Sequence, residues 1–280
     1  MPKKDHSLFQ HKVVIVTGSG QGLGRVIAES FAEAGASVVI SDIQQEAGQA
    51  VAKNIRGSGK NAVFISCDLR KENDIRKLIR LCIKKYGRLD VVVNNARPRL
   101  TIGSFEDNFK EWDLGISVLL KAPALVLKYA MPHLIRSSNG NVINIASTNA
   151  FSVSHQPLVY HVAKAGLVQL SRYIAFQFGT QGVRSNVVCP GLVDLSDARS
   201  PLTGNSVNKK VVESIVPLGR AASAQEVANV VLSLCSDDAS YVTGQVVNVD
   251  GGLMLGDHFH IARKTLLDEG SPAVTKKGKK

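Results

Sequence analysis

The stretch that decides the fold is residues 13–24, VVIVTGSGQGLG, in which a β-branched run leads directly into a glycine-rich turn. Its first five residues are typical of a buried strand. Gly18, Gly22 and Gly24 follow, and residues 24–35 then repeat apolar side chains at helical spacing. A strand, a glycine-rich turn and a helix in this order predict a site where backbone N–H groups at a helix N-terminus approach a phosphate.

Beyond this unit, short apolar runs alternate with longer stretches of helical period, such as residues 72–86. Continuously apolar strands with helices between them predict a parallel sheet covered on both faces, so the fold class is α/β with a doubly wound sheet. We expect one domain over 1–256 and an extension over 257–280, whose last ten residues are predicted to be disordered. The predicted strands are 13–17, 37–41, 61–67, 89–94, 142–146, 184–189 and 245–249.

Asp42 makes the prediction of a dinucleotide site more specific, because it ends the second predicted strand 18 residues after Gly24. A carboxylate at this place accepts hydrogen bonds from the ribose hydroxyls of a dinucleotide and repels a 2′-phosphate. No Arg or Lys lies within the glycine-rich turn or next to Asp42. The sequence therefore predicts NAD rather than NADP. The alternative is that the glycines serve an ordinary turn and close packing.

The composition excludes several classes of protein. Of the 280 residues, 44% are apolar and 20% charged, as in folded globular proteins rather than disordered ones. No stretch approaches 18 uncharged apolar residues and the N-terminus lacks an apolar segment, so we expect neither a transmembrane helix nor a secretory signal. Four widely spaced cysteines, without a C-x-x-C pair, favour reduced core thiols over a disulfide framework or a metal site, and hence a cytoplasmic location.

The net charge of +11, from 34 Lys and Arg against 23 Asp and Glu, leaves two interpretations open. A basic surface can bind nucleic acid or an anionic membrane. Part of the excess lies at the chain ends, however, and no basic stripe interleaved with aromatic residues is present. We therefore favour a solvated surface with a basic tail, and expect neither nucleic acid nor a membrane as a partner.

Three residues further along the chain point to acid/base chemistry. Ser147 lies just beyond the fifth predicted strand, Tyr160 follows 13 residues later, and Lys164 is one helical turn further on. The i, i+4 spacing places Tyr160 and Lys164 on one helix face, where the ammonium stabilises a phenolate. Such a tyrosine can exchange a proton with an alcohol, while a serine hydroxyl holds the same oxygen. A surface Tyr/Lys pair is the alternative, since Y-x-x-x-K alone is common.

Taken in order, the motifs resemble those of the short-chain dehydrogenase/reductase family over about residues 10–252. The resemblance implies a single Rossmann domain with a seven-stranded parallel sheet. It also implies NAD-dependent interconversion of a secondary alcohol and a ketone on a small-molecule substrate. A homotetramer or homodimer, formed through the helix that carries Tyr160, is expected as well. The matching motifs are TGSGQGLG at 17–24, CDL at 67–69, NNA at 94–96, Ser147, Tyr160 with Lys164, CPG at 189–191 and VDGG at 249–252.

The same resemblance implies roles for individual residues. Asp68 would bind the adenine amino group with Leu69 beside it, and Lys164 would also hold the nicotinamide ribose. The backbone of Val193 would bind the carboxamide of the nicotinamide. Ser147, Tyr160 and Lys164 would be the catalytic residues. The implied cofactor-binding residues are Gly18, Gln21, Gly22, Leu23, Gly24, Asp42, Ile43, Asp68, Leu69, Asn94, Ala96, Tyr160, Lys164, Pro190, Gly191 and Val193.

Three positions depart from the family pattern. Arg97 stands where a glycine is usual, Leu119 where an asparagine holds a water of the proton relay, and Leu195 where a threonine is usual. Leu119 cannot form a hydrogen bond with its side chain. Two hypotheses follow: an active enzyme with a modified relay, which we favour because Ser147, Tyr160 and Lys164 are all present, or a non-catalytic or weakly active NAD-binding homologue with an interaction role.

The substrate is expected to be polar, with a sugar-like or anionic character. Arg97 and Arg99 follow the fourth predicted strand, where a guanidinium can clamp a carboxylate or a phosphate. Pairing with Glu106 or Asp107, or simple solvation, is the alternative for these arginines. Residues 194–210 are predicted to form a substrate lid, whereas His258 and His260 lack metal-ligating neighbours and predict no metal site. Other candidate substrate residues are Asn149, His155 and Gln156.

Overall fold

The computed structural model describes residues 8–102, 105–106, 109–195, 206–257 and 261. Several sequence-based expectations concern residues outside these ranges. They are the central part of the expected lid, Asp107, His258, His260 and the basic tail.

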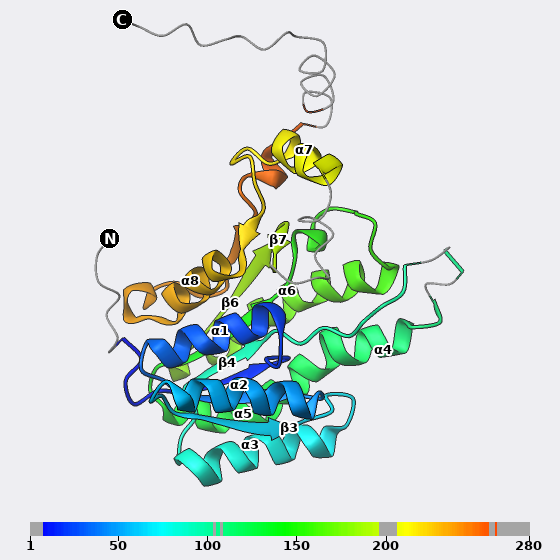
Figure 1. Ribbon diagram of the computed structural model, residues 1–280. Coiled ribbons are helices and arrows are strands. Elements are labelled where there is room, and N and C mark those ends of the chain that lie inside the picture. The colour runs from blue at the N-terminus through cyan, green and yellow to red at the C-terminus, as the bar shows by residue number, and fades with distance from the viewer. Residues whose placement is uncertain (1–7, 103–104, 107–108, 196–205, 258–260, 262–280) are drawn as a thin grey trace, which may run out of the picture.

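A seven-stranded sheet forms the centre of the molecule (Figure 1). Every neighbouring pair in it is parallel, and the strand order is β3-β2-β1-β4-β5-β6-β9. The predicted fold class, a doubly wound parallel sheet of seven strands flanked by helices, is confirmed. The strands are β1 (Val13–Thr17), β2 (Ser37–Asp42), β3 (Ala62–Ser66), β4 (Val91–Asn94), β5 (Gly140–Ile145), β6 (Val183–Pro190) and β9 (Val246–Val249).

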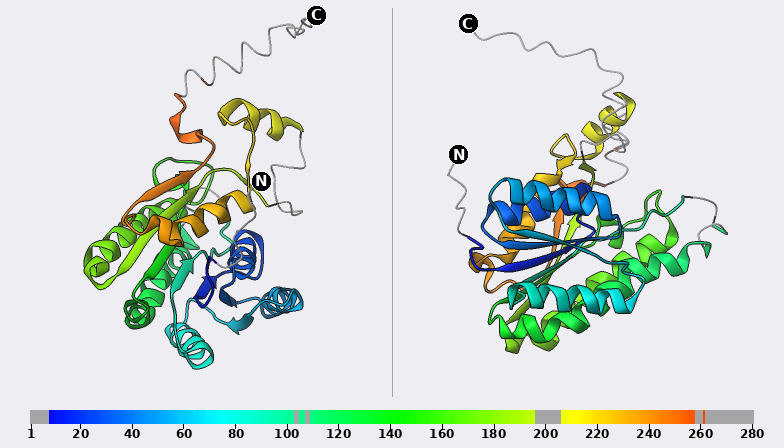
Figure 2. Two further views of the ribbon diagram at one scale, coloured as in Figure 1. Left: turned by 90° about the vertical axis from the view of Figure 1, so that its left-hand side faces the viewer. Right: turned by 60° about the horizontal axis from the view of Figure 1, so that its bottom comes forward.

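Helices cover both faces of the sheet: α1, α2 and α8 lie on one face, and α3, α5 and α6 on the other (Figure 2). Between α4 and α5 the chain makes one stretch of π-helix, η2, without leaving the helical path. The helices are α1 (Gly22–Glu33), α2 (Gln45–Gly57), α3 (Glu72–Tyr86), α4 (Trp112–Ile116), η2 (Ser117–Lys121), α5 (Ala122–Arg136), α6 (Leu158–Phe178), α7 (Ser206–Ile215) and α8 (Ala224–Cys235).

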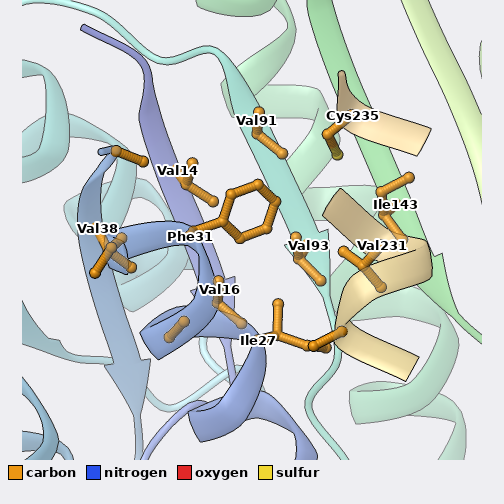
Figure 3. Packing of buried hydrophobic residues seen from close by; sticks show 14 of the residues in the cluster. Val14, Val16, Ile27, Phe31, Val38, Val91, Val93, Ile143, Val231 and Cys235 are labelled. Atoms are coloured by element: carbon orange, nitrogen blue, oxygen red, sulfur yellow. The ribbon is translucent and has the colours of Figure 1, made fainter. Parts of the chain in front are cut away.

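The apolar residues of the first strand unit fill the core on the α1 side. Val14 and Val16 of β1 pack with Ile27 and Phe31 of α1, and all four side chains are fully buried (Figure 3). Val231 of α8 closes the same cluster. Because alternate residues of a strand point to opposite faces, Val13 and Ile15 belong to the second cluster beneath α3 and α5. The apolar strand β1 therefore packs against helices on both faces of the sheet.

One helical stretch, Trp112–Arg136, is long and apolar enough to cross a membrane by length and composition alone. Half of its most apolar window is buried inside the protein. Val126, Leu127 and Leu134 pack there against the sheet and α3. Its apolar character is therefore explained by core packing.

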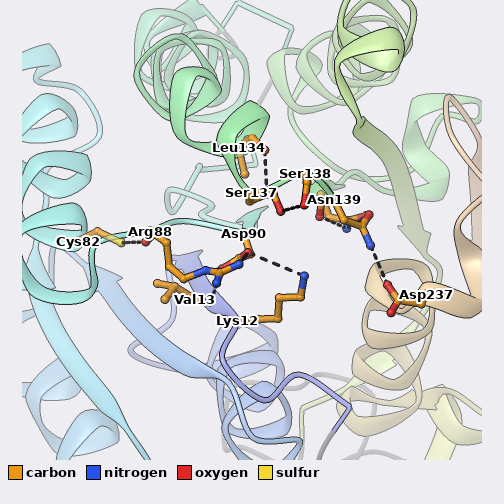
Figure 4. Close-up of polar contacts among 11 residues, drawn as sticks. Lys12, Val13, Cys82, Arg88, Asp90, Leu134, Ser137, Ser138, Asn139 and Asp237 are labelled. Carbon is orange, nitrogen blue, oxygen red and sulfur yellow. Dashed lines mark hydrogen bonds and ion pairs between the residues drawn. The ribbon is translucent and has the colours of Figure 1, made fainter.

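A buried carboxylate joins three strands at the amino end of the sheet. Asp90, which is fully buried, accepts a hydrogen bond from the backbone N–H of Val13 at 2.8 Å (Figure 4). Arg88 binds the same carboxylate through two hydrogen bonds of 2.9 and 2.6 Å. The backbone of Asp90 also bridges Val13 and Asn141. This contact fixes the register of the strands far from the edge where their carboxyl ends meet.

The structure adds a second, two-stranded sheet that the sequence pattern did not predict. In it, β7 (Val193–Asp194) pairs in parallel with β8 (Ala222–Ser223). Ser223 then caps α8 through the backbone N–H of Glu226, whose carboxylate in turn accepts from the Ser223 backbone. This small sheet holds the chain after β6 against the start of α8, at the carboxyl edge of the main sheet.

Candidate active site

The glycine-rich turn between β1 and α1 forms a tight cradle. Gly18 and Gly22 have φ angles of 64° and 55°, a region that favours glycine. A Cβ at Gly18 would lie 2.6 Å from the Cα of Ala96, and one at Gly24 would lie 2.2 Å from the carbonyl oxygen of Gly18. No side chain caps the first turn of α1. Its free N–H groups and positive dipole end therefore fit the pyrophosphate of a dinucleotide.

Asp42 lies beside this cradle at the end of β2. Its Oδ2 accepts a hydrogen bond from the backbone N–H of Gly20 at 2.8 Å, and its Oδ1 accepts one from Gln44 at 2.9 Å. A Cβ at Gly20 would lie 2.9 Å from that same Oδ2, so a side chain at this second glycine of the turn would crowd the carboxylate. These bonds hold Asp42 at the cavity edge with lone pairs still available for ribose hydroxyls.

Arg70 is a cavity residue that sequence reasoning missed. Its guanidinium donates two hydrogen bonds to Asp68, from Nε to Oδ1 at 2.8 Å and from Nη2 to Oδ2 at 2.7 Å. Hydrogen bonding to Arg70 holds the pKa of the Asp68 carboxyl below its usual range. Arg70 follows the end of β3 by four residues and so lies at the same edge of the sheet as the glycine turn. The two segments are far apart in sequence, and for that reason the sequence pattern did not indicate its place in the cavity.

One cavity of about 780 Å³ joins these groups to the predicted catalytic residues. Most of the predicted site residues line it, together with several that were not predicted. The predicted lining residues are Gly18, Gln21, Leu23, Gly24, Asp42, Ile43, Asp68, Leu69, Ala96, Arg97, Ser147, Gln156, Tyr160, Lys164, Pro190, Gly191 and Val193. Those not predicted include Ser41, Gln44, Cys67, Arg70, Asn95, Pro98, Leu114, Val118, Ile145, Ala146, Leu192 and Leu195.

Five predicted site residues do not line this cavity. Gly22 acts through its backbone conformation at the start of α1. The amide of Asn94 is buried and donates to Asn144 Oδ1 at 2.9 Å. Asn149 donates to Ser154 Oγ at 2.7 Å. Arg99 and His155 are exposed.

Asn95 links the glycine turn to the end of β4, and sequence reasoning assigned it no role. Its side-chain amide donates to the carbonyl oxygens of Thr17 at 2.9 Å and Gly18 at 3.1 Å. Its backbone N–H, and that of Ala96, donate to Thr17 Oγ1 at 3.0 and 3.3 Å. The Asn-Asn-Ala motif carried the signal, because its second asparagine is the residue that ties two strand ends together.

The predicted catalytic residues meet at the other end of the cavity. Lys164 and Tyr160 are both buried, at 3% and 7% exposed, and project from one face of α6. Lys164 Nζ lies 5.6 Å from the centroid of the Tyr160 ring and donates a hydrogen bond of 2.6 Å to the carbonyl oxygen of Ile145. Ser147 follows two residues after Ile145, and its Oγ accepts from the backbone N–H of Asn149 at 3.2 Å.

Burial changes the protonation of Lys164. The loss of water and, after it, the positive charge of Arg97 together lower the pKa of its ammonium from 10.5 to about 7. A lysine in this state exchanges its proton near neutral pH. It can therefore take part in proton movement as well as supply charge.

Arg97 lies over the ring of Tyr160, with its guanidinium carbon 4.8 Å from the ring centroid. Its Nη2 donates a hydrogen bond of 2.9 Å to Gln156 Oε1. The two residues come from separate segments, one after β4 and one just before α6. Two cations therefore flank the same tyrosine, since Lys164 approaches it as well.

Leu119 occupies the family's asparagine position in η2 and is 1% exposed. It packs with Tyr160 and Ala163. A second cavity of about 10 Å³, lined by Leu119, Asn94 and Lys164 among others, lies next to it. This is about the space of a single water molecule. The π-helical turn is thus present without the amide that the family pattern places in it.

The comparisons with known proteins agree with this geometry. Residues 18–254 match the family described as Enoyl-(Acyl carrier protein) reductase. The chain is 33% identical over 253 residues to the 3-oxoacyl-(acyl-carrier-protein) reductase FabG of Thermotoga maritima, covering 88% of this chain and 99% of that protein. It is 34% identical over 244 residues to the dehydrogenase/reductase SDR family member 4 of Homo sapiens, covering 86% and 87% of the two chains.

A solved structure shows the same fold. The gluconate 5-dehydrogenase of Burkholderia cenocepacia, in complex with NADP and tartrate, has a TM-score of 0.81 at 26% identity, covering 90% of this chain and 99% of that one. The family match runs through the glycine turn and α6, and FabG is matched almost from end to end. This chain therefore belongs to the short-chain dehydrogenase/reductase family of NAD(P)-dependent oxidoreductases, which act on alcohols and ketones.

Proposed function

We propose that the protein uses NAD to interconvert a secondary alcohol and a ketone on a small polar substrate. The observation that carries this proposal is that Tyr160, Lys164 and Ser147 line the same cavity as the glycine cradle and Asp42. The nicotinamide, when bound, supplies the hydride acceptor or donor. All other steps belong to side chains of this chain.

Tyr160 is the proposed acid/base. As a phenolate, its oxygen takes the proton of the alcohol during oxidation, and as a phenol it gives that proton back during ketone reduction. Ser147 donates a hydrogen bond to the same substrate oxygen and so fixes its position. Lys164 stabilises the phenolate when it carries its proton, and its Nζ is held at the end of β5 by the carbonyl of Ile145.

The proposed preference for NAD rests on Asp42. Its carboxylate is anchored by two backbone N–H groups and lines the cavity where the ribose of a dinucleotide would lie. A 2′-phosphate would place negative charge against it. Arg70, which lines the cavity beside Asp68, is already paired with that carboxylate. Since a similar structure, the gluconate 5-dehydrogenase of Burkholderia cenocepacia, contains NADP, the preference is tested by comparing the two cofactors directly.

The deciding experiment is the Tyr160→Phe variant. It should bind NAD as the wild type does, since the ring and its packing remain, while turnover falls by a factor on the order of 10³ or more because the proton has no acceptor. Binding is measured by titration with NADH and turnover by NADH absorbance across a panel of alcohols and ketones. Unchanged turnover would refute the assignment of Tyr160.

A second candidate function, a weakly active or non-catalytic NAD-binding protein, is favoured by one observation. Leu119 fills the place beside Lys164 where an amide would hold a relay water. The Leu119→Asn variant separates the two candidates. If the wild type is the active enzyme that we propose, the change alters turnover modestly; if the wild type is inert on the whole panel and the variant turns over, the second candidate is correct.

The assembly and location remain proposals as well. We propose one domain over 1–256, a cytoplasmic location, and a homodimer or homotetramer formed through α6. Support for the interface comes from the outer face of α6, where Val162, Tyr173 and Phe176 are exposed. Burying such a row of apolar side chains against a second copy would stabilise an oligomer.

A further inference from the structure

We propose that Arg97 recognises a carboxylate on the substrate, so that the protein acts on hydroxy acids and the corresponding keto acids. This inference rests on the proposed function of the cavity. It goes further by naming the substrate class and the residue that selects it.

The position of Arg97 is the first support. It lies in the cavity wall three residues after the end of β4, and its guanidinium stacks on the Tyr160 ring at 4.8 Å. The hydrogen bond to Gln156 holds one edge of the guanidinium at 2.9 Å. The group is therefore fixed next to the proposed acid/base, where it can reach a substituent close to the reacting carbon.

The second support is the contrast between Arg97 and other arginines of the chain. Among the described residues, three arginines bind carboxylates through two hydrogen bonds each, whereas none of the ion pairs found there involves Arg97. Its partner, Gln156, is a neutral amide. A guanidinium has five N–H donors, so most of the binding capacity of Arg97 remains for a ligand. The three paired arginines are Arg70 with Asp68, Arg88 with Asp90 and Arg220 with Glu226.

The third support is the charge of the cavity. Its only acidic lining residues, within the part of the chain that is described, are Asp42 and Asp68. Both lie near the glycine cradle, and both are held by partners. The catalytic end instead carries Arg97 and Lys164 with no acid beside them. A carboxylate on the substrate would pair with the Arg97 guanidinium, which is otherwise exposed to solvent.

The donor chemistry distinguishes a carboxylate from the other polar classes. Sugar hydroxyls both donate and accept, whereas a guanidinium only donates and matches a group that only accepts. A phosphate also accepts, but it carries nearly two charges. Both Arg97 and Arg99 are exposed, but the second arginine that could serve a phosphate, Arg99, does not line the cavity. A single planar guanidinium fits a single planar carboxylate.

The test compares three keto acids with their methyl esters: pyruvate, acetoacetate and levulinate. Each compound is titrated calorimetrically into the protein with and without NADH, and reduction is followed where it occurs. At least one acid should bind the wild type ten-fold or more tightly than its ester, or about 1.4 kcal/mol. In Arg97→Gln this advantage should fall to about two-fold or less, while binding of the esters is unchanged. Arg99→Gln is the matched control and should retain the advantage.

Two results would overturn the inference. Equal binding of acid and ester for all three pairs in the wild type would exclude a carboxylate site. An acid preference that survives in Arg97→Gln would assign the site to another residue. Failure of the proposed function is separate, since it would appear as loss of NADH binding or as full turnover in Tyr160→Phe. If the proposed function fails, the titrations without NADH still show whether the protein binds the acids more tightly than their esters.

Discussion

Lys164 Nζ lies 5.6 Å from the ring centroid of Tyr160, and its hydrogen bond goes to the carbonyl of Ile145. Lys164 is 3% exposed, and Arg97 places a like charge nearby. The charged form of Lys164 should therefore lower the free energy of unfolding, and its protonation should make that free energy depend on pH. Two predictions come from this one side chain, and two more come from the cofactor cradle.

Replacing Lys164 by methionine should stabilise the cofactor-free protein at low pH. The folded-state pKa of Lys164 is about 7, against about 10.4 in an unfolded chain. The unfolded state binds more protons between these values, so the wild type gains stability as pH rises from about 7 to 10 and bears the full cost below 7. Lys164→Met should exceed the wild type by about 1–4 kcal/mol at pH 6.

The measurement is urea unfolding of both proteins at pH 6 and pH 9. The advantage of Lys164→Met should shrink at pH 9, because the folded lysine is then largely neutral and no longer buries a charge, while the unfolded lysine is still protonated. An advantage of the same size at the two pH values would show that packing, rather than the buried charge, decides the difference.

Removing the charge of Arg97 should raise the pKa of Lys164. Burial is the main cause of the low pKa and the guanidinium is the second, so Arg97→Gln leaves the first cause in place. We expect an upward shift of roughly half to one unit. The measurement is a pH titration of the lysine side-chain NMR signals, with Lys164→Met used for assignment. A shift in the opposite direction, or none, would mean that the two cations do not interact.

Adding one methyl group to the cradle should weaken cofactor binding. A Cβ at Gly24 would lie 2.2 Å from the carbonyl oxygen of Gly18 and 2.3 Å from the amide of Asn95. Gly24→Ala should therefore displace the turn, lower the stability by about 1–3 kcal/mol and weaken NADH binding at least ten-fold. Gly57→Ala is the control, since no atom lies within 4 Å of its added methyl group. Equal NADH affinity in both variants would contradict the cradle assignment.

Neutralising Asp42 should shift the dinucleotide preference. Asp42→Asn retains a side-chain oxygen that can accept from Gly20 or Gln44, but it removes the charge that repels a 2′-phosphate. The ratio of kcat/KM for NAD to that for NADP should fall about ten-fold or more, equivalent to about 1.4 kcal/mol. Thermal unfolding checks that the turn is intact. A wild type that prefers NADP would reject the proposed role of the carboxylate.

The sequence by itself determined the sheet and the helix that carries Tyr160 and Lys164. Val13–Thr17 and the later apolar runs are local signals, because a strand that is buried on both faces is apolar throughout its length. The pairing of Tyr160 with Lys164 is also local, since four residues make one helical turn. The strand limits moved by a few residues, as with β5, which begins at Gly140.

Only the tertiary structure decided the contacts between segments distant in the chain. It placed Arg97 on Tyr160, brought Arg70 into the cavity and paired β7 with β8. It also buried Leu119 against Tyr160 and Ala163 of α6. None of these contacts has a periodicity or a spacing that a single sequence displays. Each depends on the angle at which whole elements pack, which is set by the summed burial of many apolar side chains rather than by the residues in contact.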